Sequence, residues 1–296
     1  MRIIAKECFS REWVLGLKVK YPLANPVLVE KVIYAFELLG LLVRGNKPFI
    51  FRGGTSLMLL LPQPKRLSID IDVIGHFTLD DLKQAITDST FTGVEEDVRV
   101  ETSIPKSHFK ISYRSTLNRH PEYVLLDSLN VPSPYPETLT KEIESEFFKV
   151  QQVVSSAVPS IDSMLGEKLT AFAPETIGVP FGKEKSMEII KQLFDIGELF
   201  TACSGLEEVR DSYHRTFELE NGFRGSKYIT EEALDDTIRT AYLICHLDMK
   251  SSAENEKTGE LRKGIRQIAS YLLQTRFGLL NARVAAARAA YVACLI

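Results

Sequence analysis

Apolar residues recur along the chain with two different periods. In the first half, short apolar runs and alternating apolar and polar residues predict β-strands, because successive side chains of a strand point to opposite faces. The predicted strands are residues 49–51, 67–74, 97–103, 108–114 and 122–129. Spacing of three and four residues predicts helices instead. These helices are residues 8–20, 26–44, 79–87, 161–172, 189–200, 231–250 and 259–296, the last as one helix or a pair.

Helix-capping and helix-breaking residues support this assignment of strands and helices. Asn25 and Pro26 form a strong helix start, since Asn caps a helix and Pro fits its first position. The proline-rich residues 131–136 cannot lie inside a helix, and we interpret them as the passage between two lobes. The pattern therefore predicts an α+β fold with two domains, an α/β domain in residues 1–135 and an all-helical domain in residues 136–296.

Composition narrows the class of protein without naming a function. A length of 296 residues is enough for two domains, and 45% hydrophobic and 25% charged residues are ordinary for a soluble globular chain. The net charge of −3 means that an RNA partner would have to meet a local positive surface. Neither a membrane span nor a signal peptide is expected. The four cysteines and five histidines are scattered, which indicates reduced thiols, a cytoplasmic protein and no zinc site.

Asp70 and Asp72 are the first candidates for chemistry. They alternate with Ile69, Ile71 and Val73, so a strand would place both carboxylates on the same face. Two neighbouring carboxylates repel each other unless a cation lies between them. Hard oxygen ligands suit Mg²⁺, which also binds substrate phosphates. The pair therefore predicts a magnesium site.

The residues from Gly53 to Ser56 complete this motif. Gly53 and Gly54 allow a ligand to approach the main chain, and the amides of Gly54, Thr55 and Ser56 would open a helix whose positive end attracts phosphate. Taken separately, each motif is better explained as a turn or as two solvated acids. Together and in this order, they predict a site for a metal-bound nucleoside triphosphate.

These residues resemble the signature of the DNA polymerase β-type nucleotidyltransferases, and more narrowly that of AbiEii/MenT-type toxins of bacterial toxin–antitoxin systems. The similarity lies in Gly53-Gly54-Thr55-x-Leu57 followed by Arg66-x-Ser68-x-Asp70-Ile71-Asp72. It implies a nucleotidyltransferase lobe with a mixed sheet, an NTP substrate, Mg²⁺ and transfer of nucleotides, in some members to the acceptor end of tRNA. Residues 55–69 make a longer gap before Asp70 than in many polymerase β-like enzymes.

Two further residues receive roles from this resemblance. Polymerase β-like enzymes use a third carboxylate on a later strand, which makes Asp127 a candidate metal ligand; the alternative is an acid at the end of a strand. On its helix, Lys168 can extend to water or reach a phosphate. Glu167-Lys168-Leu169-Thr170-Ala171 is similar to the toxin segment whose lysine contacts the nucleotide phosphates.

Asp195 lies in Lys191-Gln192-Leu193-Phe194-Asp195-Ile196, which resembles a toxin motif with two acids. Gln192 replaces the first acid and weakens the match, whereas Asp195 matches the second. A buried acid on an apolar helix needs a partner. We therefore expect Asp195 to meet Lys168 and to orient it.

The combined hypothesis is a Mg-dependent nucleotidyltransferase toxin. Gly53–Ser56 and Lys168 would bind the phosphates, while Arg66 and Ser68 would brace the Asp strand or touch phosphate. The expected partners are NTP, an RNA acceptor such as a tRNA 3′ end, and a cognate antitoxin. The alternatives are transfer to a protein or small-molecule hydroxyl, or an inert NTP-binding module.

Overall fold

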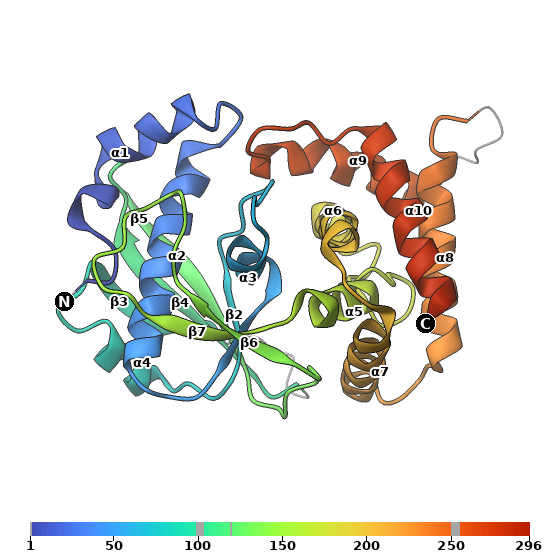
Figure 1. Ribbon diagram of the computed structural model, residues 1–296, viewed down its shortest axis with the longest axis horizontal. Helices are drawn as coiled ribbons and strands as arrows, with labels where there is room; N and C mark the ends of the chain where they lie inside the picture. The colour runs from blue at the N-terminus through green and yellow to red at the C-terminus, as the bar shows by residue number, and fades with distance from the viewer. Residues whose placement is uncertain (1, 99–103, 119, 250–254) are drawn as a thin grey trace. The chain divides into compact units, whose positions relative to one another are not determined.

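The computed structural model describes residues 2–98, 104–118, 120–249 and 255–296, and Figure 1 labels its elements. Contacts divide the chain into two compact units. The first unit contains Met1–Ser133, Thr138–Pro159 and Tyr271–Thr275; the second contains Pro134–Glu137, Ser160–Ser270 and Arg276–Ile296. The chain therefore enters the second unit briefly, returns, and visits the first unit once more near its C-terminal end.

A mixed sheet forms the centre of the first unit. Within the described residues its strand order is β3-β4-β5-β2-β1-β7-β6. The strands are β1 (Ile50–Arg52), β2 (Ile71–Ile74), β3 (Phe91–Glu96), β4 (Lys106–Arg114), β5 (Pro121–Leu129), β6 (Thr138–Glu142) and β7 (Ser155–Pro159). The pairs β2–β5 and β1–β7 are parallel and the other neighbours are antiparallel. This mixed sheet confirms the predicted α+β class.

Several predicted strands differ from the observed ones in extent. β4 and β5 agree with the predictions, but β2 starts at Ile71, so Asp70 precedes the strand instead of lying on it. The reason is that residues 65–67 pair elsewhere, with the segment that begins at Tyr271. Residues 97–98 are not strand, and residues 99–103 of that predicted strand lie outside the described residues.

The pattern did not predict β6 and β7, which lie in a region expected to be helical. Each is only five residues long, and the sequence of β7, Ser-Ser-Ala-Val-Pro, carries little hydrophobic signal. β7 pairs with β1 and with β6, and this pairing stabilises strands whose own β-propensity is low. Helical structure therefore begins at α5 and not at residue 136.

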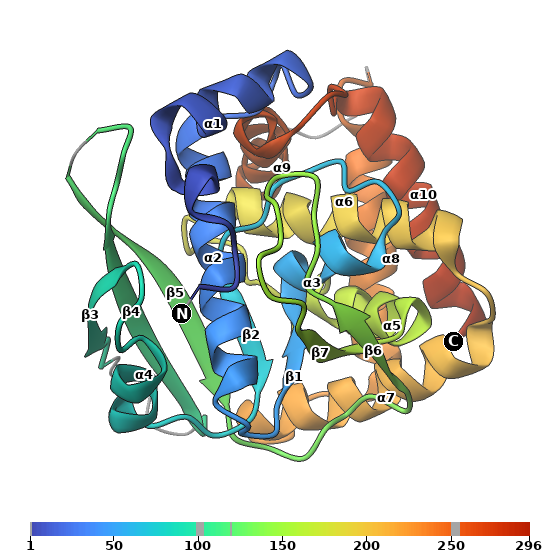
Figure 2. The ribbon, with the colours of Figure 1, turned by 60° about the vertical axis from the view of Figure 1, so that its left-hand side comes forward.

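One helix, α2 (Pro26–Arg44), covers a face of the sheet, as Figure 2 shows. It starts where the sequence predicts, with the Asn25 side chain accepting a hydrogen bond from the Val27 amide. Its Tyr34 ring stacks on Tyr113 of β4 with ring centroids 3.6 Å apart. Such aromatic packing buries a large apolar area and fixes the helix against the sheet.

Two buried carboxylates interrupt the apolar face of α2, and both are satisfied. Glu30 accepts hydrogen bonds from the Ser115 hydroxyl and from the amide and hydroxyl of Thr116. Glu37 accepts from the amides of Ile3 and Ile4. A buried carboxylate without partners would be strongly destabilising, so both side chains need these donors. The same bonds attach the turn after β4 and the N-terminal segment to α2.

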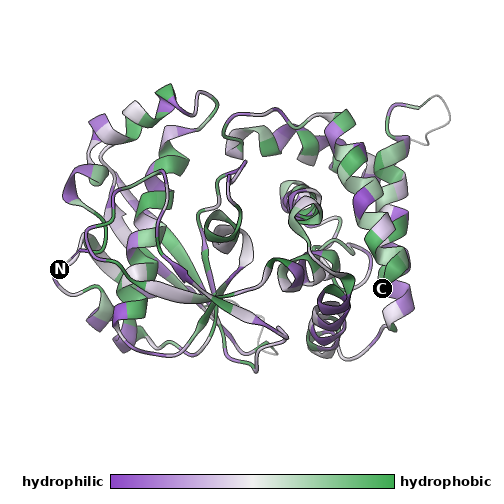
Figure 3. Cartoon of the chain, in the orientation of Figure 1, coloured by the Kyte–Doolittle hydropathy of each residue, from purple (hydrophilic) through white to green (hydrophobic). Residues whose placement is uncertain are grey.

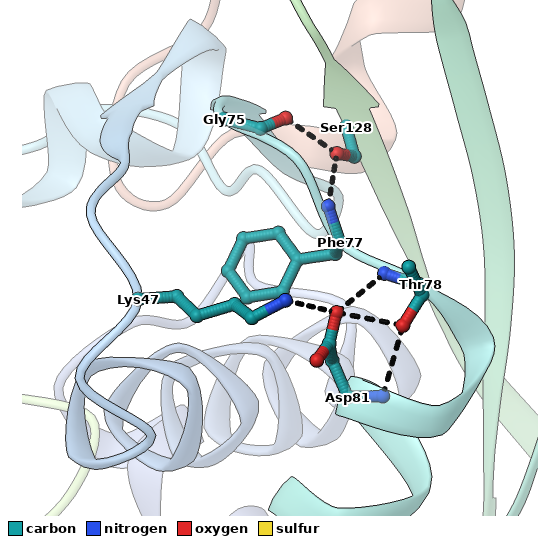
Figure 4. Close-up of polar contacts among 6 residues, drawn as sticks. All are labelled: Lys47, Gly75, Phe77, Thr78, Asp81 and Ser128. Atoms are coloured by element: carbon teal, nitrogen blue, oxygen red, sulfur yellow. Dashed lines mark hydrogen bonds and ion pairs between the residues drawn. The ribbon is translucent and has the colours of Figure 1, made fainter.

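The smaller helices of the first unit follow local signals. They are η1 (Lys6–Phe9), α1 (Arg11–Gly16), η2 (Leu17–Val19), α3 (Gly53–Leu60) and α4 (Leu79–Ala85). The predicted capping box of α4 is confirmed: the Asp81 amide donates to the Thr78 hydroxyl at 3.2 Å, and the Thr78 amide donates to the Asp81 carboxylate at 2.8 Å. Lys47 pairs with the same carboxylate, and Ser128 bridges Phe77 and Gly75 nearby (Figure 4).

The second unit is helical in its described residues. Its helices are α5 (Ile161–Ala171), α6 (Ser186–Ala202), α7 (Leu206–Phe223), α8 (Thr230–His246), α9 (Glu256–Gln267), η3 (Ile268–Tyr271, whose last residue groups with the first unit) and α10 (Leu279–Leu295). The sequence did not predict α7, because its surface is mostly polar (Figure 3) and its buried residues form only a narrow stripe. None of the described helices has both the length and the apolar character needed to cross a membrane.

Asp236 of α8 attaches that helix to the loop after α5. Its carboxylate accepts hydrogen bonds from the Glu175 amide at 2.7 Å, the Thr176 hydroxyl at 2.9 Å and the Thr240 hydroxyl at 3.3 Å. Burial raises the pKa of Asp236 to about 6, although the hydrogen bonds from Thr176 act in the opposite direction. The folded protein therefore holds the Asp236 proton more tightly than the unfolded chain does.

We expect the stability of the wild type to fall relative to Asp236→Asn as pH rises. The unfolded carboxyl ionises near pH 4, whereas the folded one keeps its proton to about pH 6. Between these values rising pH favours the unfolded state, by about 3 kcal/mol in total. Urea unfolding of both proteins at pH 4, 5, 6 and 7 measures the difference. A difference that stays constant over this range would contradict the raised pKa.

Candidate active site

The glycine pair lies where β1 ends and α3 begins. Gly53 has φ +77, in the left-handed region that favours glycine, and a Cβ atom placed there would lie 2.5 Å from the Asp72 Oδ2 atom. Asp72 pairs with Arg52 in the antiparallel register of β1 and β2. The sheet therefore holds a carboxylate directly against the first residue of α3, and only glycine leaves room for it.

Gly54 is crowded by different residues. A Cβ atom there would lie 2.7 Å from Arg66 Nη2 and 2.8 Å from Ser68 Oγ. Arg66 is 7% exposed, and its Nη1 donates to the Leu67 carbonyl oxygen at 3.0 Å. Arg66 and Ser68 thus lie at the start of α3, and their role in bracing the Asp strand or touching phosphate stays a prediction.

The first amides of α3 have no acceptor within the helix and carry partial positive charge. The Thr55 hydroxyl donates to the Asp70 carbonyl oxygen at 2.6 Å, and the Ser56 hydroxyl donates to the Gly53 carbonyl oxygen at 2.8 Å. Both hydroxyls are therefore used to shape the turn. The backbone amides, and not these two hydroxyls, are therefore the donors that this helix start offers to the phosphate expected from the sequence.

Asp127 lies in line with Asp72 across the sheet. The two residues are paired in the parallel register of β2 and β5, and His108 of β4 is paired with Asp127 on its other side. One Asp127 oxygen lies 2.6 Å from His108 Nδ1 and the other 2.6 Å from Lys106 Nζ. Burial raises the pKa of Asp127, but the charge of Lys106 and the bond to His108 outweigh it and lower the pKa.

This arrangement bears on the expected metal site. Within the described ranges, no three His, Cys, Asp or Glu side chains gather as a metal-binding group. Both oxygens of Asp127 already bind cationic or hydrogen-bonding partners, so its role as a third ligand stays a prediction. Asp70 and Asp72 are half-buried and offer hard oxygen atoms. Two carboxylates fit Mg²⁺, which is commonly bound by one or two carboxylates together with substrate phosphates.

In the second unit, Lys168 of α5 and Asp195 of α6 meet as predicted. The Lys168 ammonium lies 3.5 Å from the Asp195 carboxylate, and the two side chains are 6% and 2% exposed. Gln192, one helical turn before Asp195, accepts a hydrogen bond from the same ammonium at 3.1 Å. The residue that weakens the motif match therefore still contacts the lysine.

Sequence reasoning missed Lys106 and His108. The only signal for His108 was its place at the start of a predicted strand, a feature that many exposed residues share, and Lys106 lies just before the predicted strand 108–114. Register with β5 brings both to Asp127, and a register between strands far apart in sequence cannot be read from either strand alone.

The family model described as "Nucleotidyl transferase AbiEii toxin, Type IV TA system" matches residues 40–275. The chain belongs to the AbiEii family. It is therefore a nucleotidyltransferase from a toxin family of type IV toxin–antitoxin systems, which confirms the predicted family and enzyme class. The match includes both the Gly53–Asp72 region and the Lys168–Asp195 pair of this AbiEii protein.

Solved structures also resemble this AbiEii protein. One is the crystal structure of JHP933 from Helicobacter pylori, with 16% sequence identity, a TM-score of 0.48, and coverage of 90% of this chain and 91% of that chain. Another is an antigenic nucleotidyltransferase-like protein from Paracoccidioides brasiliensis, with 16% identity, a TM-score of 0.41, and coverage of 66% and 91%. Among curated proteins, none matches the sequence significantly.

We expect Gly53→Ala to destabilise the protein by about 1–2 kcal/mol, because a side chain in the left-handed region is strained, and to displace the Asp72 carboxylate. Gly222→Ala in α7 is the matched control, since a Cβ there meets nothing within 4 Å and alanine favours helix. Urea unfolding of the two variants measures the effect. Equal stability of Gly53→Ala and Gly222→Ala would contradict the close approach of Asp72.

Proposed function

We propose that this AbiEii-family enzyme uses Mg²⁺ and an NTP to transfer nucleotides to RNA, with a tRNA 3′ end as the acceptor. The observation that carries the proposal is the convergence of the Asp72 carboxylate and the Arg66 guanidinium on the start of α3. A negative group, a positive group and free helix amides at one place suit a metal-bound triphosphate.

The Arg66 charge suits the same ligand. A phosphate bound at this helix start would accept charge-assisted hydrogen bonds from the guanidinium together with hydrogen bonds from the helix amides. We assign the β- and γ-phosphates to the amides of Gly54, Thr55 and Ser56 and to Arg66, with Ser68 beside them.

Asp70 and Asp72 would hold Mg²⁺. When bound, this ion offsets the charge of the triphosphate and eases attack on the α-phosphorus. The contribution of the protein is electrostatic and positional, since its charged groups are held in place before the reaction starts. The Thr55 hydroxyl, bound to the Asp70 carbonyl oxygen, keeps the residue before β2 in position.

Lys168 is assigned to the charge that develops on the leaving pyrophosphate. Its burial and its contacts with Asp195 and Gln192 support a fixed position in place of a flexible surface one. Asp195 is a positioning residue that acts through Lys168. The choice of RNA as acceptor rests on the motifs shared with AbiEii/MenT-type toxins, and the same family supports a cognate antitoxin as partner.

Asp72→Asn should reduce nucleotide transfer by at least ~100-fold, the scale for losing a preorganised electrostatic contact, while the protein still folds. Incorporation of labelled NTP into total RNA and into total protein measures transfer and acceptor class together. Asp80→Asn is the control, because the Asp80 side chain on α4 is 92% exposed. Label in protein instead of RNA would contradict the RNA acceptor, and unchanged transfer by Asp72→Asn would contradict the site.

Lys168→Met should lower turnover at least ~10-fold and also destabilise the protein by about 3–5 kcal/mol, because it leaves Asp195 buried without its cation. The double variant Lys168→Met/Asp195→Leu should recover stability but not turnover. Exposed Lys227→Met is the control. If turnover returns together with stability in the double variant, then Lys168 has a structural role only.

A further inference from the structure

A segment near the C-terminal end of the chain belongs to the first unit. Residues Ser160–Ser270 and Arg276–Ile296 group with the second unit, but Tyr271–Thr275 groups with the first. Leu272 and Leu273 of this segment are each 1% exposed. These five residues therefore group with the unit that contains the glycine pair, whereas the residues on both sides of them in sequence group with the second unit.

The segment pairs with the loop that leads to Asp70. The Leu67 amide donates to the Tyr271 carbonyl oxygen at 2.7 Å, and the Leu273 amide donates to the Lys65 carbonyl oxygen at 3.1 Å. Between these two bonds, Arg66 and Leu272 face each other as an antiparallel bridge. This is the narrow type of antiparallel pair, in which the opposed residues do not bond to each other and their side chains lie closest.

The paired loop has no regular secondary structure of its own. Residues 61–70 connect α3 to β2 without forming a helix or a strand, and Pro62 and Pro64 remove backbone donors from it. Arg66 is nevertheless buried, with its guanidinium at Gly54. The bonds to Tyr271 and Leu273 flank Arg66 on both sides, so they fix the backbone from which its side chain extends.

We propose that residues Tyr271–Leu273 of this segment position Arg66, with Leu272 as the central residue. The inference rests on the proposed phosphate-binding role of Arg66. The two backbone bonds set the direction of the Arg66 Cα–Cβ bond, and Leu272 restricts the side chain that lies beside it. Without the segment, the backbone that carries the Arg66 side chain is less firmly held, and NTP binding weakens because the guanidinium must be ordered when the NTP binds.

A general stabilising role predicts a different result from a positioning role. If Leu272 and Leu273 only fill the core, shortening them lowers the unfolding free energy and leaves the affinity of the folded enzyme for NTP unchanged. A positioning role instead changes the KM for NTP through Arg66. The effect of Leu272 must then disappear when Arg66 is already absent.

The test is a double-mutant cycle with Leu272→Ala and Arg66→Ala, measured as KM and kcat for NTP in the full-length enzyme under conditions where all variants are folded. We expect Leu272→Ala to raise KM about fivefold or more with a smaller change in kcat, the signature of lost binding. In the Arg66→Ala background the same change should have no further effect on KM. Gln274→Ala, at an exposed position of the same segment, is the matched control and should behave as wild type.

Other outcomes separate this inference from the proposed function. A raised KM in Arg66→Ala with an unchanged KM in Leu272→Ala, or equal effects of Leu272→Ala in both backgrounds, would overturn the positioning role alone. An unchanged KM in Arg66→Ala would overturn the phosphate assignment of Arg66. If Leu272→Ala does not fold, Leu272→Val replaces it in the cycle. Hydrogen exchange at the Leu67 amide should be faster in the folded Leu272 variant than in Gln274→Ala, and equal exchange would also overturn the inference.

Discussion

The close approach of two opposite charges to the start of α3 is the constraint on which the rest of the first unit depends. The Asp72 carboxylate occupies the space where a side chain of residue 53 would lie, and the Arg66 guanidinium occupies the space at residue 54. Each approach is possible because glycine has no Cβ atom, and Gly53 also adopts a positive φ. The helix end favours the carboxylate and disfavours the guanidinium, because the first amides of a helix carry partial positive charge.

Two pieces of secondary structure place these charges. The register of β1 against β2 positions Asp72, and the short pairing of residues 65–67 with Tyr271–Leu273 positions Arg66. In the same sheet, the pairing of β2 with β5 places Asp127 beside Asp72, and the pairing of β5 with β4 brings its two basic partners to Asp127. A shift of one residue in the pairing of the sheet strands would turn Asp72 and Asp127 to the opposite face of the sheet, where α2 packs. Correct register is therefore a condition for the chemistry as well as for the core.

Buried charged groups outside this region follow a common rule. Glu30 and Glu37 of α2 and Asp236 of α8 each accept two or more hydrogen bonds, and each attaches an irregular segment to a helix. Lys168 and Asp195 differ, because they join two regular helices that are already packed. A buried ion pair adds little net stability compared with apolar residues of similar size. Stability alone therefore does not explain the Lys168–Asp195 pair.

The sequence by itself determined the family, the α+β class, the capped starts of α2 and α4, and the meeting of Lys168 with Asp195. These features depend on local patterns or on motifs short enough to be read along the chain. Tertiary structure alone decided the strands β6 and β7, the late start of β2, the partners of Asp127 and the return of Tyr271–Leu273 to residues 65–67. The physical reason is that each of these depends on backbone or side-chain pairing between segments far apart in sequence, and such pairing leaves almost no local signal in either segment.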